Sequence, residues 1–589
     1  MKYPTQSLMV MVLLLVGALY FNNLDTISFW EDESWLAIAI GDGWRDVWTF
    51  ASQRGVHPPL YFYIAYVMKP FIGDSEYALR WLGGLIALVG IAGIYQLGTA
   101  LSDGDRRVGV FAALLAGGSI YLIYLARLAR QYTLFYTLST LTYWVYWCWQ
   151  ARPSARGASV LMLLQCANLY THYFSAFVAL SIGIHALLTR HSLRGRSWQV
   201  LLAFIGSGVL FLPWLPSILV QLNSDLGTGV FYAVNHVPDI VDNYLDRMTN
   251  NNYYLGGAGM LVGVVALWRG RLWRTASLML VGVVGTLALV VLINQTLFQW
   301  YIGRNMLYTL PLVTVIYALG LAMLWRGWAG KLAVTLYLLT FILWGQYVYG
   351  EFYPGTADWR GLMRVLASYA RPDDTFVLRG EPYSTDYYLR RYLGARVTLI
   401  PMNEWLASPT YSDRIWLIDS GQAVRFEAID QIPPAMMLTR RLVRLPIVAE
   451  FYQTAPAVPA VIFGDQMALA YASDPPTITQ GTQFMTLDLW WQALRTPDFN
   501  YSASVQVWQG TQFIAQVDGN FDGGRLDAQV LPVGQWVADA RTLILPPDLP
   551  IGTYQIRVAV YDWRDNTRLQ PVPPASDALY PLVTLTITG

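Results

Sequence analysis

The segment Trp30-Glu31-Asp32-Glu33-Ser34-Trp35 follows the first apolar run of the chain, Leu8 to Phe21, and comes shortly before His57-Pro58-Pro59-Leu60. Three acidic residues this close to an apolar run indicate a functional or structural role, because charged side chains are costly in hydrocarbon. The 589-residue sequence is 55% hydrophobic and only 13% charged, too apolar for an ordinary soluble protein. We therefore expect a polytopic α-helical membrane protein.

Composition also excludes several classes of protein. The net charge is +1 without a long basic run, so we expect no nucleic-acid partner and no polybasic lipid anchor. The two cysteines, Cys148 and Cys166, both lie in apolar segments, which excludes a disulfide framework and a CxxC-type metal site. No small-residue cleavage site follows the first apolar run, so an uncleaved first membrane helix is expected, with a signal peptide as the alternative.

The number of crossings follows from the loops that carry Lys and Arg, because short cytoplasmic loops collect basic residues. Between consecutive basic loops there is enough apolar sequence for the chain to cross the membrane and cross back. If all of these loops are cytoplasmic, the chain crosses about eleven times and ends outside. The loops contain Arg106 and Arg107, Arg152 and Arg156, Arg190, Arg194 and Arg196, Arg269, Arg271 and Arg274, and Arg326 and Lys331.

The apolar segment Leu60 to Ile72 tests this topology. With about 13 residues it is too short to span about 30 Å of hydrocarbon. If it crossed, every later basic loop would lie outside. We therefore expect an interfacial helix, with all of Asp25 to Ala78 at the extracytoplasmic surface.

After Tyr349 the apolar runs shorten and charges become regular, which indicates an extracytoplasmic region in two parts. We expect a membrane domain at 1–350, an α/β domain at 351–473 and a β-sandwich at 474–589. The α/β domain rests on the helical pattern Gly361 to Tyr369 and on strand-like runs, and the sandwich on period-2 strands separated by Gly, Pro and Asn. The first set of strands is Thr375 to Leu378, Val397 to Ile400, Ile415 to Ile418 and Val458 to Phe463, and the second is Phe484 to Leu489, Ala503 to Trp508, Tyr554 to Tyr561 and Leu582 to Ile587.

This topology brings polar residues together at the outer leaflet. Carboxylates that face a group of cations at headgroup depth are typical of a base beside a phosphate site. The residues are Glu31, Asp32, Glu33, His57, Arg80, Arg127, Arg130, Tyr132, His172 and Arg304.

These motifs resemble GT-C glycosyltransferases of the protein O-mannosyltransferase and aminoarabinose-transferase type, which use polyprenyl-phosphate sugars. The resemblance covers about Met1 to Ala370. Its elements are the Asp32-Glu33 pair, His57-Pro58-Pro59-Leu60, Gly73 to Arg80, Arg127 to Tyr132, Thr171-His172-Tyr173-Phe174, Arg304 with Pro311, and Asp358-Trp359-Arg360.

The resemblance implies an inverting transfer in the plasma membrane of a bacterium, with Asp32 as general base and Glu33 assisting or binding a divalent ion. It assigns the donor phosphate to His57, Arg80, Arg130 and Arg304. Tyr132 and His172 are candidate substrate-binding residues. Metal-binding relatives carry Glu where this chain has Val56, which argues against a tight zinc site of that kind.

Other interpretations remain open from the sequence. The acidic loop could be solvated, Arg127 and Arg130 could reach headgroups, and His172 could be structural. Trp490, Trp491 and Trp508 fit either sugar stacking or a strand core. At the level of function, the alternatives are a lipid-sugar transporter and a membrane anchor for the C-terminal domains. The sequence identifies neither the sugar nor the acceptor, which could be a protein, a glycolipid or a cell-wall glycan.

Overall fold

In the computed structural model, the chain divides into two compact units, Met1–Thr356 and Ala357–Gly589. The first unit is helical, and all of the described strands lie in the second. The structure describes residues 4–589 apart from 42, 54–56, 191–195, 223–235, 298–300, 353–356, 395–396, 410–411, 421–431, 434–435, 445 and 472–474.

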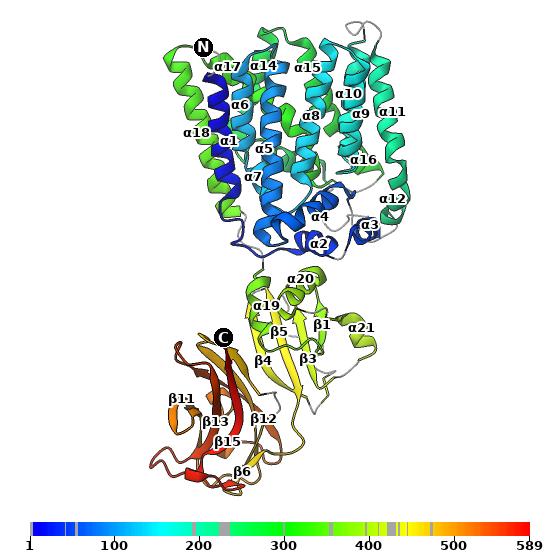
Figure 1. Ribbon diagram of the computed structural model, residues 1–589. Helices are drawn as coiled ribbons and strands as arrows, with labels where there is room; N and C mark the ends of the chain where they lie inside the picture. The colour runs from blue at the N-terminus through cyan, green and yellow to red at the C-terminus, as the bar shows by residue number, and fades with distance from the viewer. Residues whose placement is uncertain are drawn as a thin grey trace. The chain divides into compact units, whose positions relative to one another are not determined.

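The first unit is a bundle of helices that lie side by side (Figure 1). Helix α17 (Leu310–Leu324) is apolar all round and buried from Leu310 to Ala322, as expected for a helix surrounded by others. The other helices of the bundle include α1 (Pro4–Phe21), α5 (Glu76–Leu101), α6 (Arg106–Gly117), α8 (Tyr132–Ala151), α9 (Ala155–Leu169), α10 (Ser175–Leu188), α11 (Ser197–Phe211), α14 (Tyr253–Arg269), α18 (Gly327–Phe352), and α15 (Trp273–Met279) and α16 (Thr286–Thr296), which belong to one stretch of 24 residues.

Several helices support a membrane location. Among the described residues, five helices are long and apolar enough to cross a membrane, or up to six if α6 and α7 (Ile120–Ala126) form one bent span. Helices α9 and α10, with 15 and 14 residues, are shorter than the roughly 20 residues of a typical span. The expected eleven crossings therefore remain a prediction.

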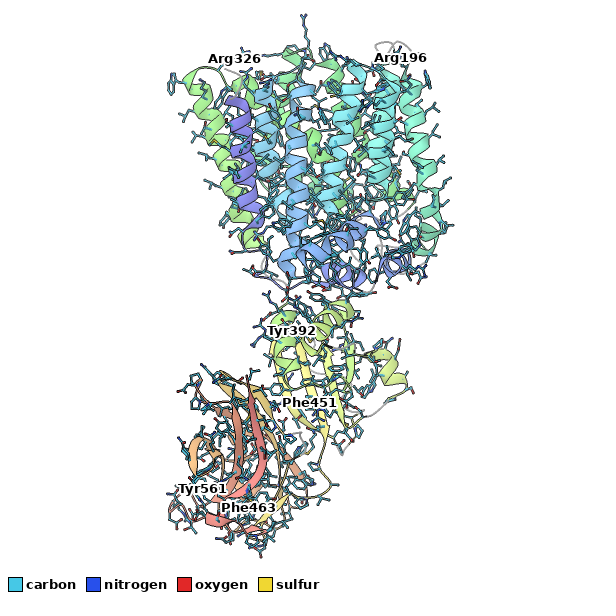
Figure 2. The ribbon with its side chains drawn as sticks, viewed as in Figure 1. Arg196, Arg326, Tyr392, Phe451, Phe463 and Tyr561 are labelled. Carbon is cyan, nitrogen blue, oxygen red and sulfur yellow. The ribbon has the colours of Figure 1, made fainter. Side chains whose placement is uncertain are left out.

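The two ends of the bundle differ in the residues that they carry. Arg196 and Arg326 lie at one end (Figure 2). The short helices α2 (Glu31–Ala39), α3 (Trp44–Gln53) and α4 (Leu60–Ile72) lie at the other (Figure 1). The helix expected at Leu60 to Ile72 has these bounds in the structure, and the Leu60 amide donates to the Tyr170 carbonyl at 3.0 Å, so the segment is docked on the turn after α9.

A break between α6 and α7 redirects the chain toward this second end. The two helices meet at 62°. The side chain of Asn250, which is fully buried, accepts from the Ile120 amide at 2.9 Å and donates to the Gly118 carbonyl at 3.2 Å. Asn250 thus satisfies backbone groups that the break would leave without partners, and α7 leads directly into Arg127 to Arg130.

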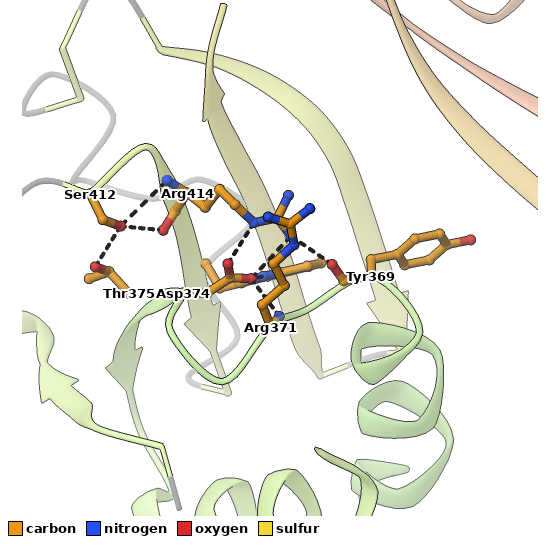
Figure 3. Close-up of polar contacts among 7 residues, drawn as sticks. Tyr369, Arg371, Asp374, Thr375, Ser412 and Arg414 are labelled. Carbon is orange, nitrogen blue, oxygen red and sulfur yellow. Dashed lines mark hydrogen bonds and ion pairs between the residues drawn. The ribbon is translucent and has the colours of Figure 1, made fainter. Parts of the chain in front are cut away.

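The second unit contains a five-stranded sheet of order β2-β1-β3-β5-β4. Strands β1, β2 and β3 are parallel and β5 runs antiparallel to β3. In Figure 3, the Asp374 carboxylate accepts from Arg414 at 2.6 Å and from the Arg371 amide at 3.0 Å, which ties the entry of β1 to β3. The elements are α19 (Trp359–Ala367), β1 (Thr375–Arg379), α20 (Pro382–Leu393), β2 (Leu399–Pro401), α21 (Met402–Ala407), β3 (Arg414–Asp419), β4 (Met436–Arg444) and β5 (Ile447–Thr454).

Two further five-stranded sheets, of order β11-β10-β13-β15-β8 and β12-β9-β7-β6-β14, contribute to one hydrophobic core. Alternating residues of β9 and β10, such as Leu487, Leu489, Val505 and Val507, lie in that core. The strands are β6 (Val461–Phe463), β7 (Met467–Tyr471), β8 (Thr477–Thr479), β9 (Phe484–Ala493), β10 (Ser502–Gln509), β11 (Gln512–Gly519), β12 (Trp536–Ile544), β13 (Gly552–Tyr561), β14 (Pro571–Val572) and β15 (Tyr580–Thr588).

One expectation about this unit differs from the structure. Strand β6 was expected in the α/β domain, but β6 pairs with β7 and β14, and β7 pairs with β9. The strand is short and apolar, so its sequence does not reveal which sheet it joins. The expected boundary at 473/474 lies outside the described residues. Trp490 and Trp491 are both fully buried, so they pack in the interior and are not available to a sugar.

Candidate active site

Asp32 lies in the first turn of α2, where three consecutive carboxylates favour the helix N-terminus electrostatically. Its Oδ2 is 3.4 Å from Arg304 Nη1 and 3.7 Å from Arg130 Nη2. The Asp32 side chain keeps 19% of its surface exposed, and Arg304 keeps 27%. The structure therefore brings the expected base together with two expected phosphate ligands, from sequence positions about 100 and 270 residues away.

The neighbouring carboxylate, Glu33, has a different environment. It forms a two-pronged ion pair with Arg80, with Nε to Oε1 at 2.8 Å and Nη2 to Oε2 at 2.6 Å. Its Oε1 also accepts from the Ala129 amide at 2.8 Å. The side chains of Glu33 and Arg80 are only 0% and 5% exposed.

Arg80 has no N–H group left for a phosphate. Besides Glu33, it donates to the backbone carbonyls of Leu24, Ile27 and Ser28. These contacts use all five donors of a guanidinium. The structure thus separates Glu33 and Arg80 from the group around Asp32, although the sequence placed all of them in one site.

Arg130 connects the two groups. Its Nη1 donates to the backbone carbonyl of Asp32 at 2.7 Å, and its side chain is only 2% exposed. Because Ala129, the preceding residue, is held by Glu33, the Glu33 contact also fixes the position of Arg130. Arg304 is more open, with its Cζ 5.5 Å from the centre of the Tyr132 ring, a distance at which a cation is attracted by the ring.

Two histidines adjoin the arginines. The ring of His57 lies 5.2 Å from that of His172 and 6.2 Å from that of Tyr132, and His172 stacks on Phe135 at 4.5 Å. Burial, together with Arg130, holds the pKa of His57 well below its usual value. Burial and Arg304 lower the pKa of His172 to about 3. Both imidazoles are therefore neutral at physiological pH, whereas the sequence indicated a cation at His57.

Several buried polar atoms near Asp32 lack a hydrogen-bond partner among the described residues. They include His57 Nδ1, Tyr61 Oη, Arg130 Nε and Tyr132 Oη, and Trp30 Nε1 next to the acidic turn. Unpaired buried polar groups are costly, each by roughly 1 to 3 kcal/mol. Each such group needs an explanation, and a role in binding or catalysis is one of them.

Sequence reasoning missed Arg247, which comes from α13 (Val237–Met248). Arg247 packs closely against Gly303, the residue before Arg304. Even a methyl group added at Gly303 would lie only 2.5 Å from Arg247 Nε. The guanidinium also lies 5.8 Å from the Tyr121 ring, whose hydroxyl donates to the Gly303 carbonyl. The sequence signal that could have revealed it is the position of Arg247 on the apolar face of the amphipathic segment after His236, next to Tyr244 and Met248.

The donor set does not favour a resident metal ion. Among the residues that the structure describes, no group of three or more His, Cys, Asp or Glu side chains could hold one. Of the two carboxylates considered, Glu33 is paired with Arg80 and Asp32 faces two guanidinium groups. Val56 lies outside the described residues.

Comparisons with known proteins agree with this architecture. Residues 56–217 match the family described as "Dolichyl-phosphate-mannose-protein mannosyltransferase". The resemblance to GT-C glycosyltransferases is confirmed. Among curated proteins, none matches the sequence.

Among solved structures, the chain is similar to ArnT from Cupriavidus metallidurans. The apo form matches with 12% identity and a TM-score of 0.52 over 76% of this chain and 98% of ArnT. The form of ArnT bound to undecaprenyl phosphate matches with 13% identity and a TM-score of 0.52 over 77% and 98%. At these identities the likeness establishes the fold.

Proposed function

We propose that the chain is an inverting glycosyltransferase that moves a sugar from a polyprenyl-phosphate donor to an extracytoplasmic acceptor. The observation that carries this proposal is the partly exposed Asp32 carboxylate facing Arg130 and Arg304 at one end of the bundle. The match to ArnT, which has been solved with undecaprenyl phosphate, supports a lipid-phosphate donor. Charge gathered at one end, instead of at mid-membrane, favours a transferase over a transporter.

In this proposal Asp32 is the general base. It takes the proton from the acceptor hydroxyl or amine as that group attacks the anomeric carbon, and the bond from this carbon to the phosphate oxygen breaks. The ion-pair distances of 3.4 and 3.7 Å are long beside the 2.6 Å of Glu33 and Arg80. An arriving phosphate can therefore recruit the guanidinium groups and leave the Asp32 carboxylate to act as a base.

The remaining residues receive revised roles. Arg304 and Arg130 hold the charge of the leaving phosphate, while neutral His57 and His172 and the Tyr132 hydroxyl supply hydrogen bonds to the phosphate or sugar. Glu33 and Arg80, which the resemblance placed in catalysis and phosphate binding, instead position the acidic loop and the Ala129 amide.

We also propose the topology and domains that the sequence indicated: eleven crossings in a bacterial plasma membrane, with α2 to α4 and the C-terminal domains outside. The pairing of β6 with β7 and β14 moves the start of the proposed β-sandwich to the region between β5 and β6. Single cysteines near Ser52 and Thr385 should react with an impermeant reagent in intact cells, and one near Gly104 should not. Labelling at Gly104 would contradict this orientation.

The test of the function is mass spectrometry of lipid-linked sugars and glycoconjugates from cells with and without the protein. We expect a polyprenyl-phosphate sugar to accumulate and one glycoconjugate to disappear when the protein is absent. Expression of the wild-type chain should reverse both changes, and expression of Asp32→Asn should not. Full restoration by Asp32→Asn would remove the proposed base.

A further inference from the structure

The two outward sheet faces of the C-terminal pair of sheets have different surroundings. In β9, Leu487, Leu489 and Trp491 face the shared core, so Asp488 and Trp490 lie on the outward face. Arg440 of β4 forms an ion pair with Asp488, and both side chains are largely buried. This face is therefore covered by the α/β region of the same unit.

The outward face of the other sheet is rich in polar side chains. In β10, Ala503, Val505 and Val507 face the core, so Ser504, Gln506 and Trp508 lie outward. The register places Arg557 opposite Gln506, Gln555 opposite Trp508, and Tyr561 opposite Ser502. Trp508 therefore marks one end of a strip roughly 20 Å long, at about 3.3 Å per residue, and Tyr561, which is labelled in Figure 2, marks the other end.

Aromatic side chains form one end of this strip. Trp508 packs edge-on against Phe513 with ring centres 5.5 Å apart, and Phe513 is 45% exposed. The guanidinium of Arg557 lies 5.1 Å from the Trp508 ring, and the indole Nε1 donates to Gln506 Oε1 at 3.0 Å. These contacts hold the Trp508 ring in one orientation.

Amide and charged groups along the strip are also held in place. Gln516 Nε2 donates to Asp518 Oδ2 at 2.8 Å, and Arg557 Nε donates to Gln555 Oε1 at 2.9 Å. A glutamine amide carries donors and an acceptor together, which matches a sugar hydroxyl that can donate and accept. The negative charge of Asp518 and the positive charge of Arg557 cancel, so these two residues give the strip no net charge.

We propose that this face, defined by Trp508, Gln516, Asp518, Arg557 and Tyr561, binds a neutral glycan chain. Gln506, which is only 6% exposed, holds the Trp508 indole in place. Aromatic rings accept the C–H faces of sugars by apolar contact, and the amides between the rings pair with hydroxyls. A nucleic acid would require a net positive surface, and a stable protein partner would require an interface core depleted of charge. The site lies in the second unit and is separate from the proposed transfer reaction.

The test uses the full chain in nanodiscs. The probes are linear tetrasaccharides of mannose, glucose and N-acetylglucosamine, titrated by calorimetry. Trp508→Ala and Arg557→Ala should each weaken binding of the preferred probe by about 5- to 10-fold. Phe484→Ala is the control, because Phe484 is a 63% exposed aromatic residue on β9 of the other sheet, and it should bind as the wild type does.

Thermal melting of each variant separates loss of binding from loss of folding. Asp32→Asn should bind the tetrasaccharides normally, so a failure of this site and a failure of the proposed transfer reaction are distinguishable. The proposal is overturned if no probe binds the wild type, if Phe484→Ala loses as much binding as Trp508→Ala, or if only a uronic-acid tetrasaccharide binds. A dimer in solution that Trp508→Ala dissociates would assign the face to a second copy of the chain.

Discussion

Two adjacent groups of charges at the end of the bundle differ in how fully they are satisfied. The pair Glu33 and Arg80 is closed, because the Arg80 donors and the buried Glu33 carboxylate all have partners within the protein. In the other group, Asp32 and Arg304 are partly exposed, Arg130 is buried with its Nε unpaired among the described residues, and both ion pairs to the Asp32 carboxylate are longer. The charges that hold the structure therefore differ from those available to a substrate in whether their hydrogen-bonding groups all have partners within the protein, and not in residue type.

The largest expected effect concerns the closed pair. Glu33→Gln leaves the buried Arg80 charge without its counter-ion, which should reduce the free energy of unfolding by about 3 to 5 kcal/mol. Thermal melting in nanodiscs measures this loss. Asp74→Asn is the control, since Asp74 pairs with Lys69 at 3.3 Å in a partly exposed position, where a surface pair contributes at most about 1 kcal/mol. A stable Glu33→Gln variant without transfer activity would instead make Glu33 catalytic.

The next effect concerns the open group. Asp32→Asn keeps the shape of the side chain but removes its basicity, so turnover should fall by about 10² or more while donor binding persists. Transfer and donor binding are measured together in nanodiscs. The exposed Asp25→Asn in the same segment should be close to wild type. Wild-type turnover of Asp32→Asn would mean that another group removes the proton.

A smaller effect is expected at the arginines. Arg304→Ala should weaken binding of the polyprenyl-phosphate donor by about tenfold, and Arg304→Lys should recover part of it, because a point charge cannot reproduce the planar two-pronged contact. Equilibrium binding of a labelled donor measures both. The exposed Arg45→Ala on α3 controls for general loss of positive charge. Unchanged donor affinity in Arg304→Ala would remove the phosphate assignment.

The last effect, which is small for each pH unit, is a pH dependence. Because the pKa of His172 is about 3 in the folded chain and about 6.5 when unfolded, the unfolded state binds the extra proton between these values. Stability should therefore fall as the pH drops from about 6.5 toward 3, by at most about 1.4 kcal/mol per pH unit for this group. Melting temperatures across that range should vary less in His172→Gln and remain unchanged in the exposed His236→Gln. An unaltered slope in His172→Gln would show that His172 is not buried as a neutral ring.

The sequence by itself determined the features that depend on local pattern. The length of the apolar segments and the cost of charge in hydrocarbon predicted a membrane bundle and the short helix at Leu60 to Ile72. The strand-like patterns predicted a strand-containing region after the bundle. Alternation of basic loops was enough to gather Asp32, Arg130 and Arg304 at one end, because each crossing returns the chain to a known side.

Tertiary structure decided the features that depend on partners distant in the chain. Asp32 and Glu33 are adjacent and chemically alike, yet only Glu33 meets Arg80 and the Ala129 amide. Strand β6 joined a sheet that its own three residues could not specify. His57 and His172 became neutral because burial and nearby guanidinium groups act on them together. Burial and pairing are properties of the assembled neighbourhood, and no local sequence pattern encodes them.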